Sequence, residues 1–259
     1  MTDSTRSPSP DPRSRFSDRV ADYVRTRPDY PEAVLAALRA AGVGPGSRVA
    51  DVGSGTGIVS ALLLRSGATV AAVEPNAEMR AAAEARLGRE ARFRSVAGSA
   101  EATGLAEGSV DLVTAAQAFH WFDREAARVE FQRILRVGGL VALVWNVRRE
   151  ASTPFLREYE ALLRRFGTDY GKVNHRNIDP AQIRDFYGGE VEVRSFPHAQ
   201  AHDREGIRGR LLSSSYTPRE GDPAREPMLE ELDAIFARHA REGVVRIEYD
   251  TELYVGECR

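Results

Sequence analysis

Residues 48–76, RVADVGSGTGIVSALLLRSGATVAAVEPN, decide the fold of this chain. They open with an apolar, β-branched run, Arg48–Val52, and close with a second such run, Thr69–Val73. Between the two runs stand glycines at positions 53, 55 and 57, followed by apolar side chains at helical spacing. The order strand, glycine turn, helix and strand predicts the βαβ unit of a parallel sheet.

The glycine turn indicates a site for an adenosine-bearing cofactor. Glycines accept a positive φ and let a ligand approach bare backbone, while the N-terminus of the next helix offers N–H groups. Glu74 follows the first glycine by about 20 residues, where nucleotide-binding units carry the acid that accepts both ribose hydroxyls.

Three cofactor classes fit such a turn at first, and its residues discriminate between them. The dinucleotide fingerprint G-x-G-x-x-G needs a glycine where Ile58 stands, and the phosphate-binding P-loop needs a lysine that this region lacks. Residues 51–57 instead read D-x-G-x-G-x-G. This segment resembles motif I of class I S-adenosylmethionine (SAM) methyltransferases.

A second informative stretch is AAQAFHWFD, which follows the buried strand expected at residues 109–114. Three aromatic side chains and a histidine at residues 119–122 are costly to expose without a function, and open α/β sheets bind ligands at the carboxyl ends of their strands. The string QAFHWF resembles the fourth-strand loop of trans-aconitate-methyltransferase-like and ubiquinone-biosynthesis-methyltransferase-like enzymes. The resemblance runs in order over residues 20–146.

The resemblance implies a fold and a set of cofactor-binding residues. The fold is α/β, with a Rossmann-like, seven-stranded, mostly parallel sheet, helices on both faces, an antiparallel edge pair and a helical lid. The implied SAM-binding residues are Tyr23 and Arg27 of an N-terminal flap, Asp51, Gly53, Ser54, Gly55, Thr56 and Gly57 of motif I, Glu74, Pro75, Asn76 and Met79 after the second strand, Ser99, Ala100 and Glu101 after the third, and Gln117, Ala118, Phe119 and Trp121 after the fourth. Some of these residues also have a purely structural interpretation. In that interpretation, the N-terminal helix packs on the sheet edge and leaves Arg27 in solvent, and Met79, Phe119 and Trp121 are core residues. The neighbouring Phe122 has the same two interpretations, and for Phe122 the core position is preferred.

The implied activity is metal-independent transfer of a methyl group to a small-molecule acceptor, with oxygen as the favoured acceptor atom. SAM carries its own activation, so the protein has to align the nucleophile and, for a hydroxyl or carbon acid, remove a proton. His120 is the first candidate base and His175 the second, because histidine titrates near neutral pH. A SAM-binding protein without methyl transfer and, less well supported, a nicotinamide-dependent oxidoreductase are the alternatives.

Composition narrows the partners and the compartment. The 259 residues carry a formal net charge of −2, which does not favour nucleic acid or an anionic membrane. The [DN]-P-P-[YFW] motif of enzymes that methylate nucleobase amino groups is absent from the fourth strand. One cysteine, Cys258, and the lack of a long apolar run indicate a cytoplasmic protein. A monomer and a homodimer both stay open.

The chain divides into four expected parts. They are a disordered tail at residues 1–14, a SAM-binding core with its flap at 15–147, a helical lid at 148–187, and the C-terminal part of the core sheet at 188–259. In the last two parts the pattern predicts helices at residues 155–166 and 179–187, a strand at 191–196, helices at 205–216 and 228–242, and a strand at 244–255.

Overall fold

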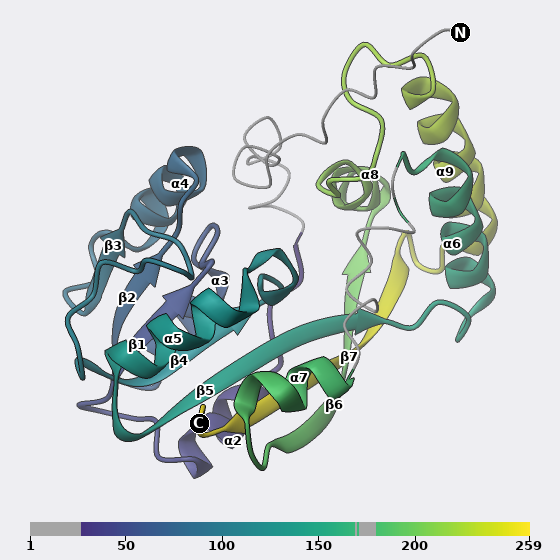
Figure 1. Cartoon of the computed structure of the whole chain (residues 1–259). Helices are drawn as coiled ribbons and strands as arrows, with labels where there is room; N and C mark the ends of the chain where they lie inside the picture. The colour runs from purple at the N-terminus through teal and green to yellow at the C-terminus, as the bar shows by residue number, and fades with distance from the viewer. Residues whose placement is uncertain (1–26, 169, 171–179) are drawn as a thin grey trace, which may run out of the picture.

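The computed structural model describes residues 27–168, 170 and 180–259. Tyr23, His175 and the expected tail at residues 1–14 lie outside the described residues. In the described part, seven strands form one sheet in the order β3-β2-β1-β4-β5-β7-β6 (Figure 1). The strands are β1 Arg48–Val52, β2 Thr69–Val73, β3 Phe93–Val96, β4 Val110–Ala116, β5 Leu135–Arg148, β6 Glu192–His202 and β7 Val245–Gly256.

The strand directions confirm the predicted fold class. Strands β1 to β5 run parallel to one another, and β7 pairs antiparallel with both β5 and β6. The strand order reverses between β1 and β4, so the loops after these two strands diverge to opposite sides. This is the place at which open α/β sheets form their ligand crevice.

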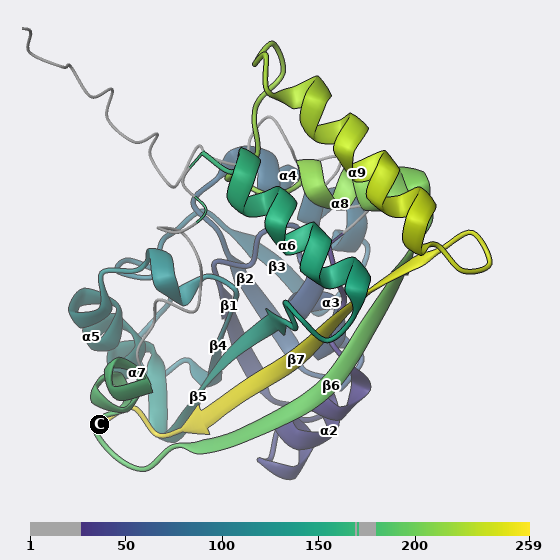
Figure 2. The ribbon, with the colours of Figure 1, turned by 90° about the vertical axis from the view of Figure 1, so that its right-hand side faces the viewer.

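Helices cover both faces of the sheet (Figure 2). On one face, buried side chains of α2 (Glu32–Ala40), α3 (Ile58–Leu64) and the end of α4 (Ala77–Leu87) pack together over the strands. On the other face lie α5 (Arg124–Ile134) and α7 (Pro180–Tyr187). Asp123 is the N-cap of α5, because its carboxylate accepts a hydrogen bond from the backbone N–H of Ala126 (3.2 Å). The sheet is therefore the middle of three layers.

A separate group of helices stands beyond the end of β5. The last pair between β5 and β7 joins Arg148 to Tyr249, whereas β6 and β7 remain paired as far as His202 and Val245. This extension of the β6–β7 ribbon carries α6 (Pro154–Phe166), α8 (Arg204–Leu212) and α9 (Arg225–His239), whose buried apolar side chains form a cluster of their own. These three helices, grouped on the right in Figure 1, are called the helical layer below.

Residues 148–187, expected as one lid insertion, divide between two clusters in the structure. Helix α6 belongs to the helical layer, but α7 packs on the sheet, where the Tyr187 hydroxyl donates to the carbonyl oxygen of Tyr254 (3.0 Å). The segment 188–259, expected as part of the sheet, also supplies α8 and α9 to the helical layer. Periodicity predicts an amphipathic helix, but it does not say which of two apolar surfaces the helix will cover.

Strand β6 is longer than the pattern predicts. The strand was expected to end at residue 196, yet β6 continues through Pro197 and His198 to His202. Proline is tolerated there because β6 is the edge strand of the sheet, so the missing N–H leaves no partner strand without a donor.

Candidate functional site

A cavity of about 690 Å³ opens at the carboxyl ends of β1 to β4 and is called the large cavity below. Its volume is within the range of sites that enclose small molecules, about 300–1,000 Å³. Its lining comes from the loops after all four strands: Gly53, Gly55, Glu74, Pro75, Asn76, Met79, Ser99, Ala100, Glu101, Ala102, Ala116, Gln117, Ala118, Trp121, Phe122 and Asp123. Most residues expected from the sequence at a cofactor site therefore meet around one space.

The glycine loop after β1 is shaped by close contacts that exclude side chains. Gly53 has φ +68°, and a Cβ atom there would lie 2.6 Å from the Cβ of Ala118. Gly57 precedes α3 with φ +78°, and a Cβ would lie 2.8 Å from Leu87 of α4. The loop is also tied to β2, since the N–H of Gly53 donates to the carbonyl of Val73 (2.8 Å). Bare backbone is thus held at the edge of the large cavity.

Glu74 links this loop to the end of β2. One carboxylate oxygen, Oε2, accepts the N–H of Gly55 and the other, Oε1, accepts the N–H of Asn76, both at 2.9 Å. Burial raises the pKa of Glu74, and the two backbone donors act in the opposite direction. Each oxygen has two lone pairs, so one acceptor position per oxygen is left after these contacts. The side chain is therefore fixed in orientation and still able to accept two hydroxyl groups.

Asp51 lies behind the loop and does not line the large cavity. Its carboxylate is 1% exposed and accepts hydrogen bonds from Ser60 (2.6 Å) and Thr114 (3.2 Å). Burial raises its pKa to about 6. Asp51 therefore ties β1 to the start of α3 and to β4. Ser54, Thr56 and Gly57 are likewise outside the lining of the large cavity.

The loop after β4 contains a strained residue at the edge of the large cavity. Gln117 has φ +55°, an uncommon value for a side chain other than glycine, and its N–H donates to Val144 (2.9 Å). The short helix η2, Phe119–Trp121, follows. Phe119 is fully buried, with its ring 4.7 Å from that of Phe186, so it belongs to the core. Trp121 and Phe122 face the large cavity.

His120 is near the large cavity but not in its lining. Burial and then the charge of Arg27 lower the pKa of His120 to about 4. Within the described residues, Nδ1 of this ring makes no hydrogen bond. The imidazole is therefore neutral at physiological pH and can accept a proton.

Arg27 turns toward the helical layer. Its Nη2 donates to the carbonyl oxygen of Ser213, directly after α8, at 2.8 Å. Arg27 is also outside the lining of the large cavity.

Some lining residues were not anticipated from the sequence. Ala102 and Ala116 carry no chemistry that distinguishes them from other alanines. Asp123 was not among the expected cofactor-binding residues, and Phe122 was preferred as core. Phe122 packs against the core and lines the large cavity as well. Ala116 is the last residue of β4, and the other three residues follow the ends of β3 and β4 by six or seven positions, so the only available signal was that they belong to loops at strand ends.

Two further findings concern metals and membranes. In the described ranges, no three His, Cys, Asp or Glu side chains are grouped so that they could bind a metal ion. Over the same residues, every helix is too short or too polar to span a bilayer.

Known proteins resemble this chain in sequence and in fold. Residues 50–143 match the family model of a methyltransferase domain. A Mycobacterium tuberculosis protein named as an uncharacterized methyltransferase is 40% identical over 225 residues, which cover 86% of each chain. A solved structure from Anaeromyxobacter dehalogenans shares the fold with a TM-score of 0.60 and 24% identity, covering 90% of this chain and 98% of that one.

A third comparison involves a structure with a bound cofactor product. Phosphoethanolamine N-methyltransferase 2 of Haemonchus contortus, solved with phosphomonomethylethanolamine and S-adenosylhomocysteine, has a TM-score of 0.56 at 15% identity, over 93% of this chain and 57% of that one. The solved structures show the fold, and the 40% identity to the mycobacterial relative over 86% of each chain settles the family. The chain belongs to the SAM-dependent methyltransferases, and SAM is its cofactor.

Proposed function

We propose that the large cavity holds SAM and that the enzyme transfers the methyl group to an oxygen atom of a small molecule. Glu74 carries the proposal, because it is fixed by two backbone N–H groups and keeps acceptor capacity toward the cavity. In this arrangement Glu74 binds the ribose hydroxyls, and the bare backbone of Gly53 and Gly55 lies beside the amino-acid part of the cofactor. The bound cofactor supplies a methyl group on a sulfonium leaving group.

The remaining lining residues fit the other parts of the cofactor. Met79 and the loop at residues 99–101 line the large cavity together with Glu74. The adenine, which is attached to the ribose, would therefore lie among them when Glu74 binds the ribose. Gln117 and Ala118 border the part of the large cavity where the loop after β4 meets the glycine loop. The strained backbone of Gln117 supports a functional position, because such strain persists where a site needs a particular geometry.

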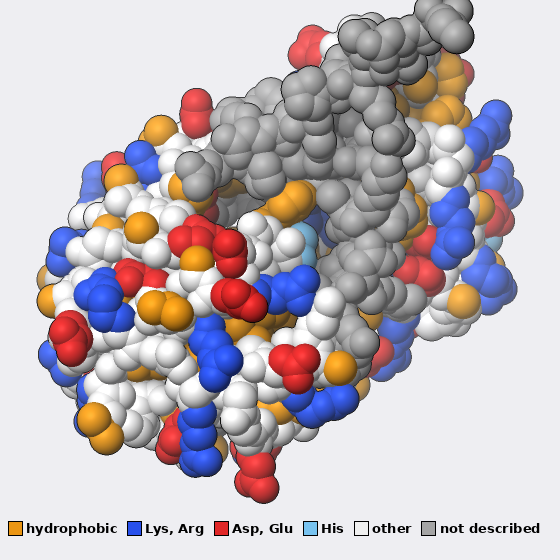
Figure 3. Space-filling model, viewed as in Figure 1, with side chains coloured by type: hydrophobic (Ala, Val, Ile, Leu, Met, Phe, Trp, Pro, Cys, Tyr) orange, Lys and Arg blue, Asp and Glu red, His pale blue; other side chains and the backbone are white. Residues whose placement is uncertain are grey.

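A small-molecule acceptor is supported by the helical layer and by the charge distribution. The helical layer stands on the β6–β7 ribbon beyond the carboxyl end of β5. On the face seen in Figure 3, basic and acidic side chains are interspersed across the described surface rather than separated by sign. With a formal net charge of −2, this surface does not favour a nucleic-acid polyanion.

His120 supports oxygen as the acceptor atom. A neutral imidazole can accept the proton of a hydroxyl group while the oxygen attacks the methyl carbon. The pKa of about 4 keeps His120 unprotonated at physiological pH and also makes it a weaker base than an exposed histidine, so its contribution depends on how closely it approaches the hydroxyl group. The single cysteine fits a reducing compartment, and we propose the cytoplasm.

The test combines binding with a substrate screen. Calorimetry should give an affinity for S-adenosylhomocysteine on the order of micromolar. The purified enzyme is then incubated with SAM and a panel of small alcohols, phenols, carboxylic acids, amines and thiols, and products are identified by mass spectrometry. Methylation of oxygen supports the proposal. Methylation confined to nitrogen, carbon or a macromolecule would contradict it.

A further inference from the structure

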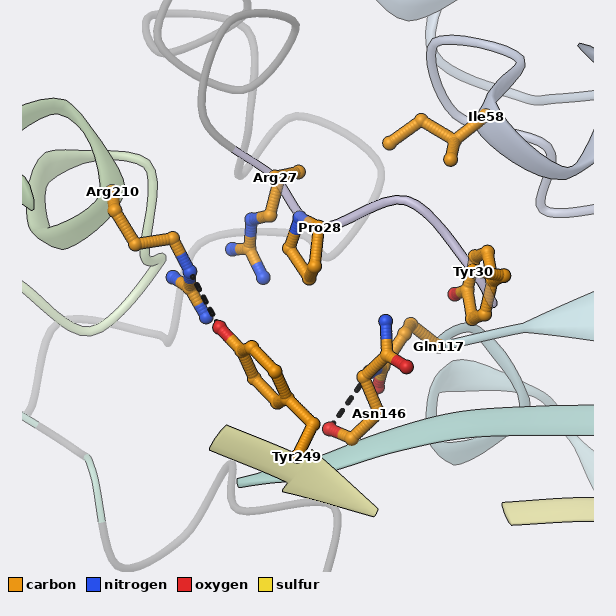
Figure 4. A pocket seen from close by; sticks show the side chains of 8 residues that line it. All are labelled: Arg27, Pro28, Tyr30, Ile58, Gln117, Asn146, Arg210 and Tyr249. Atoms are coloured by element: carbon orange, nitrogen blue, oxygen red, sulfur yellow. Dashed lines mark hydrogen bonds between the residues drawn. The ribbon is translucent and has the colours of Figure 1, made fainter. Parts of the chain in front are cut away.

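A second cavity, of about 30 Å³, lies between the strand ends and the helical layer and is called the small cavity below. Its lining is Arg27, Pro28, Tyr30, Ile58, Gln117, Asn146, Arg210 and Tyr249 (Figure 4). Gln117 also lines the large cavity, so the two spaces meet at this residue. A group bound in the small cavity is therefore next to the part of the large cavity that Gln117 borders.

Arg210 of α8 is a buried cation whose described partners are all neutral. Its side chain is 5% exposed, Nε donates to the hydroxyl of Tyr249 (3.3 Å), and Nη1 donates to the hydroxyl of Ser214 (3.1 Å). No carboxylate of the described residues is within ion-pair distance of it. Burial of a charge without a counter-ion destabilises a fold.

Neighbouring arginines show that this arrangement is an exception. Arg148 is also buried, but its Nη2 donates to the carboxylate of Glu160 at 2.6 Å. Arg208, two residues before Arg210 on the same helix, pairs with Asp233 at 2.7 Å. Among the described residues, the chain therefore supplies carboxylates to Arg148 and Arg208 and leaves Arg210 with hydroxyl groups.

Asn146 of β5 adds a second buried donor. The side chain is 3% exposed, and its Oδ1 accepts a hydrogen bond from Thr251 at 2.7 Å, which fixes the orientation of the amide. Within the described part of the chain Nδ2 has no acceptor, although it is fully enclosed. Nearly all buried polar groups in native proteins are hydrogen-bonded, and because Asn146 lines the small cavity, a group bound there can satisfy this donor.

The small cavity thus collects donors and no acids. The guanidinium groups of Arg27 and Arg210 face the same space, with the Tyr249 hydroxyl against Arg210 and the Asn146 amide beneath (Figure 4). Aspartate and glutamate are missing from the described lining. Because a water-sized group needs about 10–15 Å³ of such space, 30 Å³ admits about two, the size of the two oxygens of a carboxylate.

We propose, resting on the proposed function, that the small cavity anchors a carboxylate of the methyl acceptor, which is therefore a small organic acid. Arg210 supplies the charge and Asn146 a neutral donor, and planar guanidinium groups match the two oxygens of a carboxylate. The helical layer supplies Arg210, whereas the large cavity is built from the loops after β1 to β4. This separation favours the acceptor, rather than the amino-acid carboxylate of SAM, as the source of the anion.

The experiment measures carboxylate binding with S-adenosylhomocysteine at saturation. The probes are benzoate and glutarate, with their amides and inorganic phosphate as comparisons, and the readout is the concentration-dependent rise in the melting temperature. We expect at least one acid to bind and its amide to bind at least tenfold more weakly. Arg210→Gln should weaken binding of the acid at least tenfold, and Arg208→Gln, which alters an arginine 38% exposed and paired with Asp233, should not.

A second variant guards against misfolding. Asn146→Asp places a carboxylate in the small cavity, so it should abolish acid binding, and the new charge beside Arg210 should preserve or raise the melting temperature without ligand. Arg210→Met should also not lower that temperature, because it removes a buried charge that lacks a counter-ion. A lower melting temperature for both variants would overturn the proposal.

The remaining outcomes identify the source of the anion. If Arg210→Gln raises the dissociation constant of S-adenosylhomocysteine tenfold, the small cavity holds the cofactor carboxylate and the proposal is overturned. Binding of phosphate alone, or of neither acid, also overturns it. Failure of the wild-type protein to bind S-adenosylhomocysteine would instead contradict the proposed use of the large cavity.

Discussion

The carboxylate of Glu74 accepts the backbone N–H of Gly55 at 2.9 Å, which joins the acid after β2 to the glycine loop after β1. The two features that identify the site in the sequence are therefore in direct contact. Since the second carboxylate oxygen is held by Asn76 at the start of α4, the acid cannot rotate without breaking two hydrogen bonds. The backbone itself therefore sets the orientation of the Glu74 carboxylate.

Replacing Glu74 by alanine should weaken cofactor binding strongly. A hydrogen bond to a charged group contributes about 1.5–3 kcal/mol, which corresponds to about 10–150-fold in affinity. We expect a rise of this size in the dissociation constant of S-adenosylhomocysteine, measured by calorimetry. Glu84→Ala, on the exposed side of α4, is the matched control. An unchanged affinity for Glu74→Ala would place the ribose elsewhere.

The contact between Gly53 and Ala118 gives a second prediction. Gly53→Ala introduces a Cβ 2.6 Å from Ala118 at φ +68°, so the two loops must separate. Gly104→Ala is a matched control, because Gly104 has φ +72° and nothing within 4 Å of the added Cβ. Both variants should lose about 1–3 kcal/mol of stability from backbone strain. Only Gly53→Ala should also lose S-adenosylhomocysteine binding by calorimetry, and equal binding losses would contradict the role of this contact.

Much of the fold could be predicted from residues 48–76. The three glycines predict a tight turn, Glu74 predicts a ribose-binding acid, and the two apolar runs predict buried parallel strands. Each of these predictions depends only on residues that are close together in the sequence. The cofactor was implied by the resemblance of residues 51–57 to motif I of class I SAM methyltransferases, and Ile58 argued against the dinucleotide fingerprint. Membership of the methyltransferase family confirms these interpretations and excludes the oxidoreductase alternative.

What could not be predicted depends on tertiary contacts. Asp51 belongs to the same motif as Gly53, but Ser60 and Thr114 enclose it behind the loop. The burial of Phe119 depends on Phe186 of α7, far away in sequence. The donors of the small cavity come from four segments distant in sequence, so no spacing rule reveals Arg210 and Asn146 as neighbours of one space.

Asp51 should make stability depend on pH in a particular direction. Its pKa is raised from 3.8 to about 6 by burial, so the folded state binds the proton more tightly than the unfolded state. The stabilisation from this group is fully present below pH 3.8 and is lost as pH rises through about 6. A difference of about two pKa units corresponds to about 3 kcal/mol as an order of magnitude.

Comparison with Asp51→Asn isolates this effect, because asparagine has nearly the same shape and does not titrate. The free energy of unfolding of the variant, relative to wild type, should rise between pH 4 and pH 7 by up to about 3 kcal/mol. Urea denaturation at several pH values measures it. A difference that stays constant over this range would mean that Asp51 is ionised throughout in the folded protein.

The pH profile of methyl transfer tests His120. The base must be unprotonated, and its pKa of about 4 keeps it so above that pH. With an acceptor from the substrate screen, kcat/KM should be flat from pH 8 to about pH 5 and fall only as pH approaches 4, since this profile reports the free enzyme. His120→Ala should lower kcat by about 10²–10⁴-fold and remove the acid limb. His198→Ala is a suitable control, because His198 lies on β6 with its ring stacked on Tyr249 and lines neither cavity. If His120→Ala keeps full kcat at every pH, the acceptor oxygen needs no base from this residue.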